Sequence, residues 1–150
     1  MAFGKLSEHV GGGSYLNARD HVTTLGLLVE PKGKLLNQPH QAQNGEQITR
    51  DIFIADVAVF KDQRAIDNGQ PTEILKGVRI TAKYLARDGI ALLDAGVEAV
   101  PLKIDRTTLK NGATPFVWRD LDSNSPAYEA ISAYYQAREA SAAEFASDFD

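Results

Sequence analysis

Side chains alternate in character along the segment Ile48–Lys61, and this alternation constrains the fold more than any other feature of the chain. One set is Phe53, Ala55, Val57 and Val59, and the other is Arg50, Ile52, Ile54 and Asp56. Because successive side chains of a strand point to opposite faces of a sheet, this run predicts one long strand. Its length indicates a bend or bulge that lets the strand serve two parts of a sheet.

Four further segments have strand composition and are separated by turn signals. The expected strands are Thr23–Glu30, Glu73–Thr81, Val97–Thr107 and Thr114–Leu121. We expect Pro31 to end the first strand and the polar stretch Lys32–Gln47 to form a long loop. The sequence Asp67-Asn68-Gly69 predicts a hairpin turn, and Pro101 indicates an edge or bulge position in its strand.

Two segments have helical patterns. Ala82–Asp94 predicts a helix that Gly89 weakens and Gly96 ends. Ala127–Glu144 predicts a C-terminal helix, with Ile131, Tyr134 and Tyr135 as its docking stripe. Three strands, a helix and two strands is the element order of the oligonucleotide/oligosaccharide-binding barrel. We therefore expect an all-β-leaning fold: a five-stranded barrel with one helix between strands three and four and a C-terminal helix. The same five strands and helix could also close into a different arrangement.

The length of 150 residues suits one domain. We divide it into a flexible N-terminal segment (1–22), the barrel (23–122) and a C-terminal helix with an acidic-aromatic tip (123–150). The chain has no cysteine, which excludes disulfides and thiolate chemistry and fits a reducing cytoplasmic compartment. Its apolar runs are too short to span a bilayer, so no membrane association is expected.

The net charge of −4 is unevenly distributed. Residues 1–120 hold 15 Lys+Arg and 14 Asp+Glu, whereas residues 121–150 hold one Arg and six acids. The acidity therefore belongs to the C-terminal part, and the body is nearly neutral. The total charge does not argue against a body that binds nucleic acid.

No pattern in the sequence indicates catalysis. Gly11-Gly12-Gly13 lacks the spacing and the lysine of a phosphate-binding loop. The three histidines, His9, His21 and His40, are too few for a metal site, and we expect no metal and no cofactor. We expect a non-enzymatic protein; an enzyme would need a polar pocket that the sequence does not reveal.

Basic and aromatic residues are interleaved on the expected strands, which is the pattern of single-stranded nucleic-acid binding. Cations follow the phosphates and aromatic rings stack on the bases. The candidate residues are Arg50, Phe53, Lys76, Arg79, Lys83, Tyr84, Lys103, Arg106, Trp118 and Arg119. The competing interpretation is that the aromatic residues belong to the core and the cations to an ordinary solvated surface.

The C-terminal tip places aromatic rings among carboxylates at Phe145, Asp148, Phe149 and Asp150. Such a tip would occupy a basic groove weakly and present phenylalanines to partner proteins. The alternative is a frayed, solubilising helix end.

The stretch Arg50–Val59 resembles a strand of small actinobacteriophage single-stranded-DNA-binding proteins, and so do Thr114–Trp118, Asp122 and the helix from Ala127. The ending Ser147–Asp150 is similar to the acidic tails of such proteins, but its last residue is Asp instead of Phe. The resemblance implies an oligonucleotide-binding fold that coats single-stranded DNA with weak sequence preference in phage replication or recombination, in the host cytoplasm. It also implies recruitment of replication or recombination proteins through the tail, and leaves a homo-oligomer open. The competing hypothesis is a small β-barrel protein-interaction module that binds a host or virion protein through an apolar patch.

Overall fold

The computed structural model describes residues 14–147, with side chains as far as residue 143. Its strands are β1 (Gly26–Gln41), β2 (Gln47–Phe60), β3 (Glu73–Ile80), β4 (Val100–Arg106) and β5 (Phe116–Asp120). Its helices are α1 (Gln63–Asn68), α2 (Lys83–Asp94) and α3 (Pro126–Ser147), preceded by a 3-10 turn, η2 (Ala18–His21). The expected all-β-leaning composition, with one helix between the third and fourth strands and a C-terminal helix, is confirmed.

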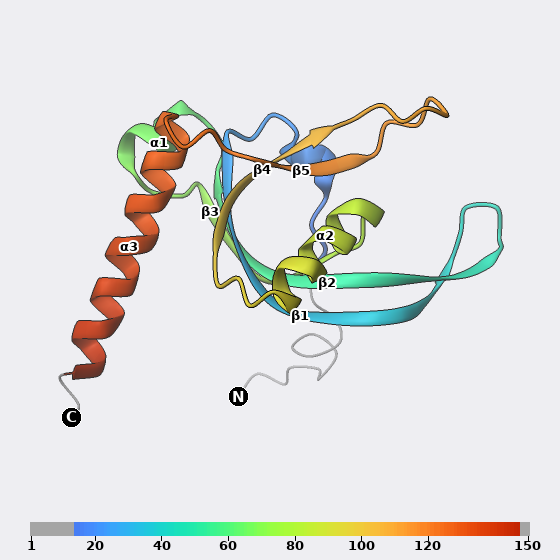
Figure 1. The fold of residues 1–150 in the computed structure, drawn as a ribbon, viewed down its shortest axis with the longest axis horizontal. Coiled ribbons are helices and arrows are strands. Elements are labelled where there is room, and N and C mark those ends of the chain that lie inside the picture. Colours follow the sequence, from blue (N-terminus) through green and yellow to red (C-terminus); the bar gives the residue numbers. More distant parts are fainter. Residues whose placement is uncertain (1–13, 148–150) are drawn as a thin grey trace, which may run out of the picture.

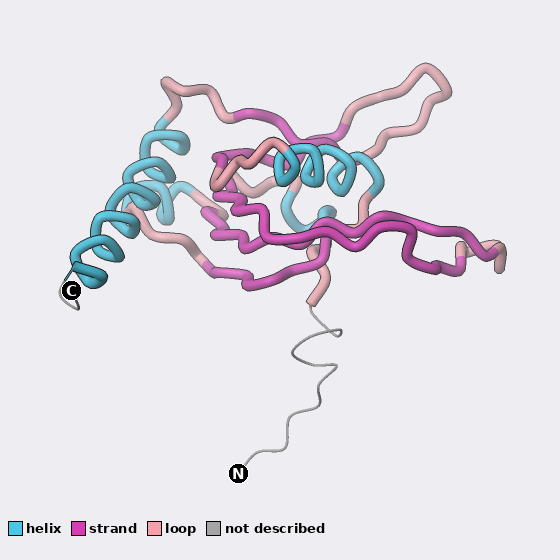
Figure 2. The backbone as a smooth tube through the Cα atoms, turned by 60° about the horizontal axis from the view of Figure 1, so that its bottom comes forward, coloured by secondary structure: helices cyan, strands magenta, loops and turns pink. Residues whose placement is uncertain are grey.

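The five strands form one antiparallel sheet in the order β3-β2-β1-β4-β5. Within the described residues no ladder joins β3 to β5, so the sheet is not closed into a barrel. This corrects the closed form of the sequence prediction. Figure 1 shows the sheet curled around α2, with the β1–β2 hairpin and the β4–β5 connection reaching out on the same side. The tube in Figure 2 shows the same two projections from another direction.

The first strand is longer than predicted, because β1 continues through Pro31 and Pro39. The residues expected to form the polar loop Lys32–Gln47 mostly pair with β2 instead, with register shifts at Pro31/Gly33 and Leu35/Gln38. Pairing with β4 stops at Val29, so one side of β1 is a free edge from there on. Proline is tolerated on an edge strand because the missing N–H breaks no ladder bond. The polar composition therefore marks an exposed ribbon, not a loop.

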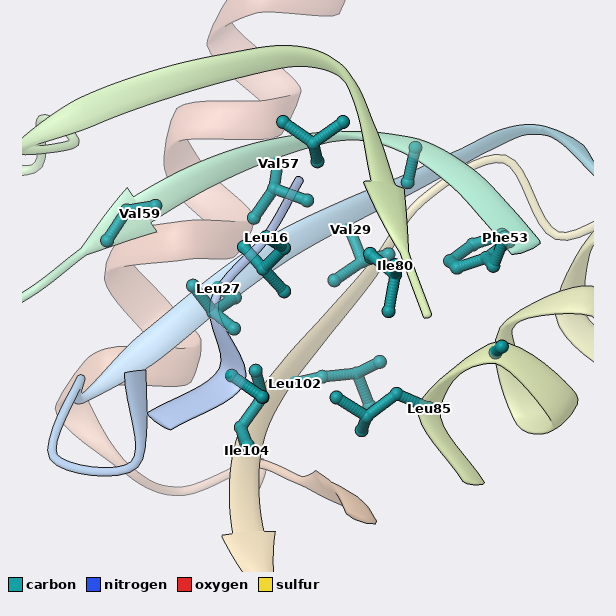
Figure 3. Close-up of a cluster of buried hydrophobic side chains, with 14 residues drawn as sticks. Leu16, Leu27, Val29, Phe53, Val57, Val59, Ile80, Leu85, Leu102 and Ile104 are labelled. Atoms are coloured by element: carbon teal, nitrogen blue, oxygen red, sulfur yellow. The ribbon is translucent and has the colours of Figure 1, made fainter. Parts of the chain in front are cut away.

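The main core fills the space between the concave side of the sheet and α2 (Figure 3). Phe53 is fully buried there, and Gly89 of α2 lies against its ring. The glycine expected to weaken the helix is thus a place where α2 and β2 approach each other closely. A second cluster on the other side of the sheet includes Phe60, Ile66 and Ile131, and it seats α1 and α3.

Two short segments, α1 and the described part of the N-terminal segment, pack beside the sheet. Asp62 accepts a hydrogen bond from Ala65 N–H (3.0 Å) and starts α1, where a hairpin turn was expected. Residues 1–13 of the N-terminal segment lie outside the described residues. Its described part packs on the sheet, since Leu16 and Ala18 are buried.

The predicted docking stripe of the C-terminal helix is confirmed. Ile131 is fully buried, and Tyr134 packs edge-on against Phe60 with ring centroids 5.6 Å apart. Arg138 of α3 donates two hydrogen bonds of 2.7 Å to the carboxylate of Glu30 on β1. These contacts anchor the first part of α3, whose C-terminal part projects away from the sheet (Figure 1).

Candidate nucleic-acid interface

The first turn of α2 presents two cations around one aromatic ring. Leu85 and Ala86 are buried against the sheet, so Lys83, Tyr84 and Arg87 lie on the opposite side of the helix. The Arg87 Cζ atom is 4.6 Å from the centroid of the Tyr84 ring, and the Lys83 Nζ atom is 5.6 Å from it. Both distances are within the range of an attractive cation–π contact.

A similar pair lies on the neighbouring β4–β5 ladder. The Arg106 Cζ atom lies 4.3 Å above the ring of half-buried Phe116, its partner in the ladder. The indole Nε1–H of Trp118 donates a hydrogen bond of 2.9 Å to the carbonyl of Leu85, and this bond holds α2 against β5. We call the group formed by Lys83, Tyr84, Arg87, Arg106 and Phe116 the cation–aromatic surface.

The projecting end of the β1–β2 hairpin, residues 36–51, is called the arm here. Between the arm and α2 lies a hollow of about 610 Å³. Its lining residues are Asn37, Ile48, Thr49, Arg50, Asp51, Thr81, Lys83, Ala86 and Arg87. The α2 cations therefore face the arm on one side and belong to the cation–aromatic surface on the other.

Some of the predicted site residues take part in these contacts. Lys83, Tyr84 and Arg106 belong to the cation–aromatic surface, Trp118 joins its two elements through the hydrogen bond to Leu85, and Arg50 lines the adjoining hollow.

The other predicted site residues lie elsewhere. Phe53 is fully buried and offers no ring face to a base, so for this residue the core interpretation holds. Lys76 is on β3, 3.5 Å from the carboxylate of Asp56, and Arg79 pairs with the chain at Tyr15. Lys103 and Arg119 are opposite each other in the β4–β5 ladder, one step from Trp118. They therefore lie on the other face of that ladder.

Two residues of the cation–aromatic surface were missed by the sequence reasoning. Arg87 is four residues after Lys83, so the two share a helix face. Phe116 is two residues before Trp118, so the two share a strand face. Both were detectable from the periods of the elements that carry them.

Acidic neighbours hold some of the cations in place. Arg87 donates to the carboxylate of Asp88 (2.9 and 3.3 Å), and this hydrogen bond raises the pKa of the Arg87 guanidinium. The carboxylate of Asp105 accepts the backbone N–H of Arg106 and faces Arg119 at 3.4 Å; both interactions, the first being the larger, lower its pKa. The Arg87 guanidinium and the Asp105 carboxylate are therefore charged at neutral pH.

The predicted C-terminal tip lies almost entirely outside the described residues. Asp148, Phe149 and Asp150 lie outside the described residues, and for Phe145 only the backbone within α3 is described. No group of three or more His, Asp or Glu residues in the described part of the chain could hold a metal ion. None of the helices described has the length and apolarity needed to cross a membrane.

No protein-family model matches this chain, and comparisons with curated proteins and with solved structures likewise find no match. The resemblance to actinobacteriophage single-stranded-DNA-binding proteins therefore stays a prediction based on the short motifs quoted above.

Proposed function

We propose that this protein binds single-stranded DNA across the cation–aromatic surface, as a non-enzymatic coating protein with weak sequence preference. The observation that carries the proposal is the pairing of cations with aromatic rings on two elements that a hydrogen bond holds together. Arg87 and Lys83 flank Tyr84, and Arg106 lies over Phe116. A single strand needs both groups, because cations neutralise its phosphates and rings stack on its bases.

The strand order supports an oligonucleotide-binding barrel that is open on one side. In the closed five-stranded form of that fold, β3 and β5 would be neighbours, and here they are the two edges of the sheet. The fold binds its ligands between the loops that join β1 to β2 and β4 to β5. In this chain those connections are residues 42–46 and 107–115, and they flank α2 on the same side of the sheet (Figure 1).

The distribution of exposed apolar side chains argues against the competing protein-interaction module. Among the residues whose side chains the structure describes, the large exposed hydrophobic ones are Tyr15, Leu25, Leu36, Ile48 and Ile74. They lie before β1, on the arm and on β3, which is a dispersed set, whereas the module requires one contiguous patch. The proposal includes a role in phage replication or recombination and the recruitment of partners by the tail. Only the resemblance supports these two parts.

The test is a fluorescence anisotropy titration of the full chain with labelled oligo-dT. We expect Tyr84→Ala and Phe116→Ala each to weaken binding about tenfold, since a stacked base contributes on the order of 1–3 kcal/mol. Arg106→Gln should weaken binding and reduce the salt dependence. Three cations on the surface predict a slope of about −2 in log K against log salt. The matched control is Arg64→Gln, an exposed arginine on α1, which lies beside α3 and away from α2 (Figure 1).

The proposal would be refuted if neither the full chain nor a chain without residues 145–150 bound oligo-dT at low salt. Equal losses of affinity for Arg106→Gln and Arg64→Gln would show that binding follows total charge and not this surface. Oligo-dT binding that is independent of Tyr84 and Phe116 would move the interface elsewhere on the sheet.

A further inference from the structure

The hollow between the arm and α2 has an unbalanced set of charges. Three of its lining residues are cations, Arg50, Lys83 and Arg87, and one is an acid, Asp51. Arg87 is also paired with Asp88 at 2.9 Å. The Oδ1 atom of Asp51 accepts the backbone N–H of Asn37 at 2.9 Å, and Asn37 holds this position with a φ of 55°. Within the described residues Asp51 forms no ion pair, so it holds the bend of the arm and does not neutralise the cations.

One hydrogen-bond donor of the Arg50 guanidinium has no acceptor in the described part of the protein. Its Nε atom is buried and has no hydrogen-bond partner among the described residues. Its Cζ atom lies 6.0 Å from the centroid of the Tyr15 ring, which supports the planar group from one side. A buried donor without an acceptor is unfavourable, so a ligand oxygen that reaches this guanidinium would offset that cost. Guanidinium matches the geometry of phosphate oxygens with two parallel hydrogen bonds.

The start of α2 adds donors to the same wall. The N-cap residue Ala82 provides no side-chain hydrogen bond, and the first turn holds no acidic residue. The first backbone N–H groups of a helix point outward and carry the positive end of its dipole. The hydroxyl-bearing residues Thr49 and Thr81 line the hollow beside them.

We propose that this hollow is a binding site for a phosphomonoester, with room for the nucleotide that carries it. Arg87 is paired with Asp88, so the lining cations without an ion pair among the described residues are Arg50 and Lys83. Their two positive charges match the −1.5 to −2 charge of a phosphomonoester at neutral pH better than the single charge of a backbone phosphodiester. The volume of about 610 Å³ lies in the range of small-ligand sites. Ile48 and Ala86 supply an apolar contact for a sugar or a base. The phosphate comes either from a free nucleotide or from the phosphorylated end of a DNA strand.

This inference goes beyond the proposed function and does not depend on it, although the two sites share Lys83 and Arg87. Arg50 distinguishes them, because it lines the hollow and is not part of the cation–aromatic surface.

The experiment is a titration of the full chain with thymidine 5′-monophosphate, thymidine and inorganic phosphate, followed by NMR chemical shifts or calorimetry. We expect thymidine 5′-monophosphate to bind, inorganic phosphate to compete with it, and thymidine to give no binding. Arg50→Gln and Lys83→Gln should each reduce the affinity for the nucleotide at least tenfold, and Arg50→Lys should reduce it less. Arg64→Gln should leave it unchanged, and thermal unfolding checks that each variant is folded.

A second arm separates the two sources of phosphate and the two sites. Oligo-dT with a 5′-phosphate, a 3′-phosphate or neither is compared for the parent chain and Arg50→Gln. If one of the phosphorylated oligonucleotides binds more tightly than the unphosphorylated one, and Arg50→Gln abolishes this difference, the hollow binds strand ends. If the three oligonucleotides bind equally, the hollow binds free nucleotides. Binding of the unphosphorylated strand should be unchanged in Arg50→Gln. Equal affinities for thymidine and its monophosphate, or a nucleotide affinity that Arg50→Gln and Lys83→Gln leave unaltered, would overturn the inference whether or not the strand binds.

Discussion

Gly89 lies inside α2, where an alanine would ordinarily improve a helix by about 1 kcal/mol. In this protein a Cβ atom at position 89 would lie 2.2, 2.5 and 2.6 Å from three carbons of the Phe53 ring. To reach an ordinary contact of 3.4 Å, ring and helix must separate by about 1.2 Å. Phe53 is fully buried, so its ring has no free space into which to retreat. Overpacking of a core costs about 1–3 kcal/mol, and this contact falls at the upper end.

We therefore predict that Gly89→Ala lowers the free energy of unfolding by about 2 kcal/mol, the packing cost less the helix gain. For a chain of this size the expected fall in the unfolding midpoint is roughly 4–8 °C. Urea and thermal unfolding are measured by the fluorescence of Trp118, the only tryptophan of the chain. The matched control is Ala91→Gly at an exposed position of α2, which should lose about 1 kcal/mol through propensity alone.

The double variant Gly89→Ala/Phe53→Leu tests the cause. Removal of the ring frees the space that the new methyl group needs, so the two changes together should cost at least about 1 kcal/mol less than their sum. A Gly89→Ala variant that is more stable than the parent, or effects of the two changes that are strictly additive, would refute the close approach of α2 to the sheet.

Three further predictions concern the contacts that hold the helices and the turn η2. Arg138→Met should destabilise the protein by about 1–2 kcal/mol in urea unfolding, because it leaves the mostly buried Glu30 carboxylate without its partner; adding Glu30→Gln should recover part of the loss. Trp118→Phe removes the hydrogen bond to the Leu85 carbonyl and should cost about 1 kcal/mol, measured by circular dichroism, together with weaker oligo-dT binding. Burial lowers the pKa of His21 below its ordinary value of 6.5, so the unfolded chain takes up the proton first. The His21 contribution to stability is complete above pH 6.5 and is lost as the pH falls through the lowered pKa. His21→Gln should therefore reduce the pH dependence of the unfolding free energy between pH 7 and pH 5. An unchanged pH dependence would contradict this prediction.

Several elements were predictable from the sequence because local patterns determine them. The alternation in β2 requires a strand with one buried face, and the observed burial of Phe53, Ala55, Val57 and Val59 follows it. The apolar stripe of α3 and the positive φ of Gly96 after α2 are likewise local features. The element types therefore followed from the period of the side chains.

The site was only partly predictable. The sequence pointed to Lys83, Tyr84 and Arg106 through their residue types, but which aromatic rings are exposed depends on what packs over them. Phe53 and Trp118 have similar sequence surroundings; the first is covered by Gly89 of α2, and the second donates to the backbone of the same helix. These contacts join residues more than thirty positions apart, and no local pattern records them.

The sequence by itself determined the strands β2 to β5, the helices α2 and α3 and the separation of a nearly neutral body from an acidic C-terminal part, since period, capping and charge are properties of neighbouring residues. Only the tertiary structure decided that the polar stretch after Pro31 forms an arm, because its strand depends on pairing with β2. It also decided that the sheet is open between β3 and β5, which depends on how far the strands curl. The hollow, with Arg50 on the arm facing the cations of α2, is a consequence of both.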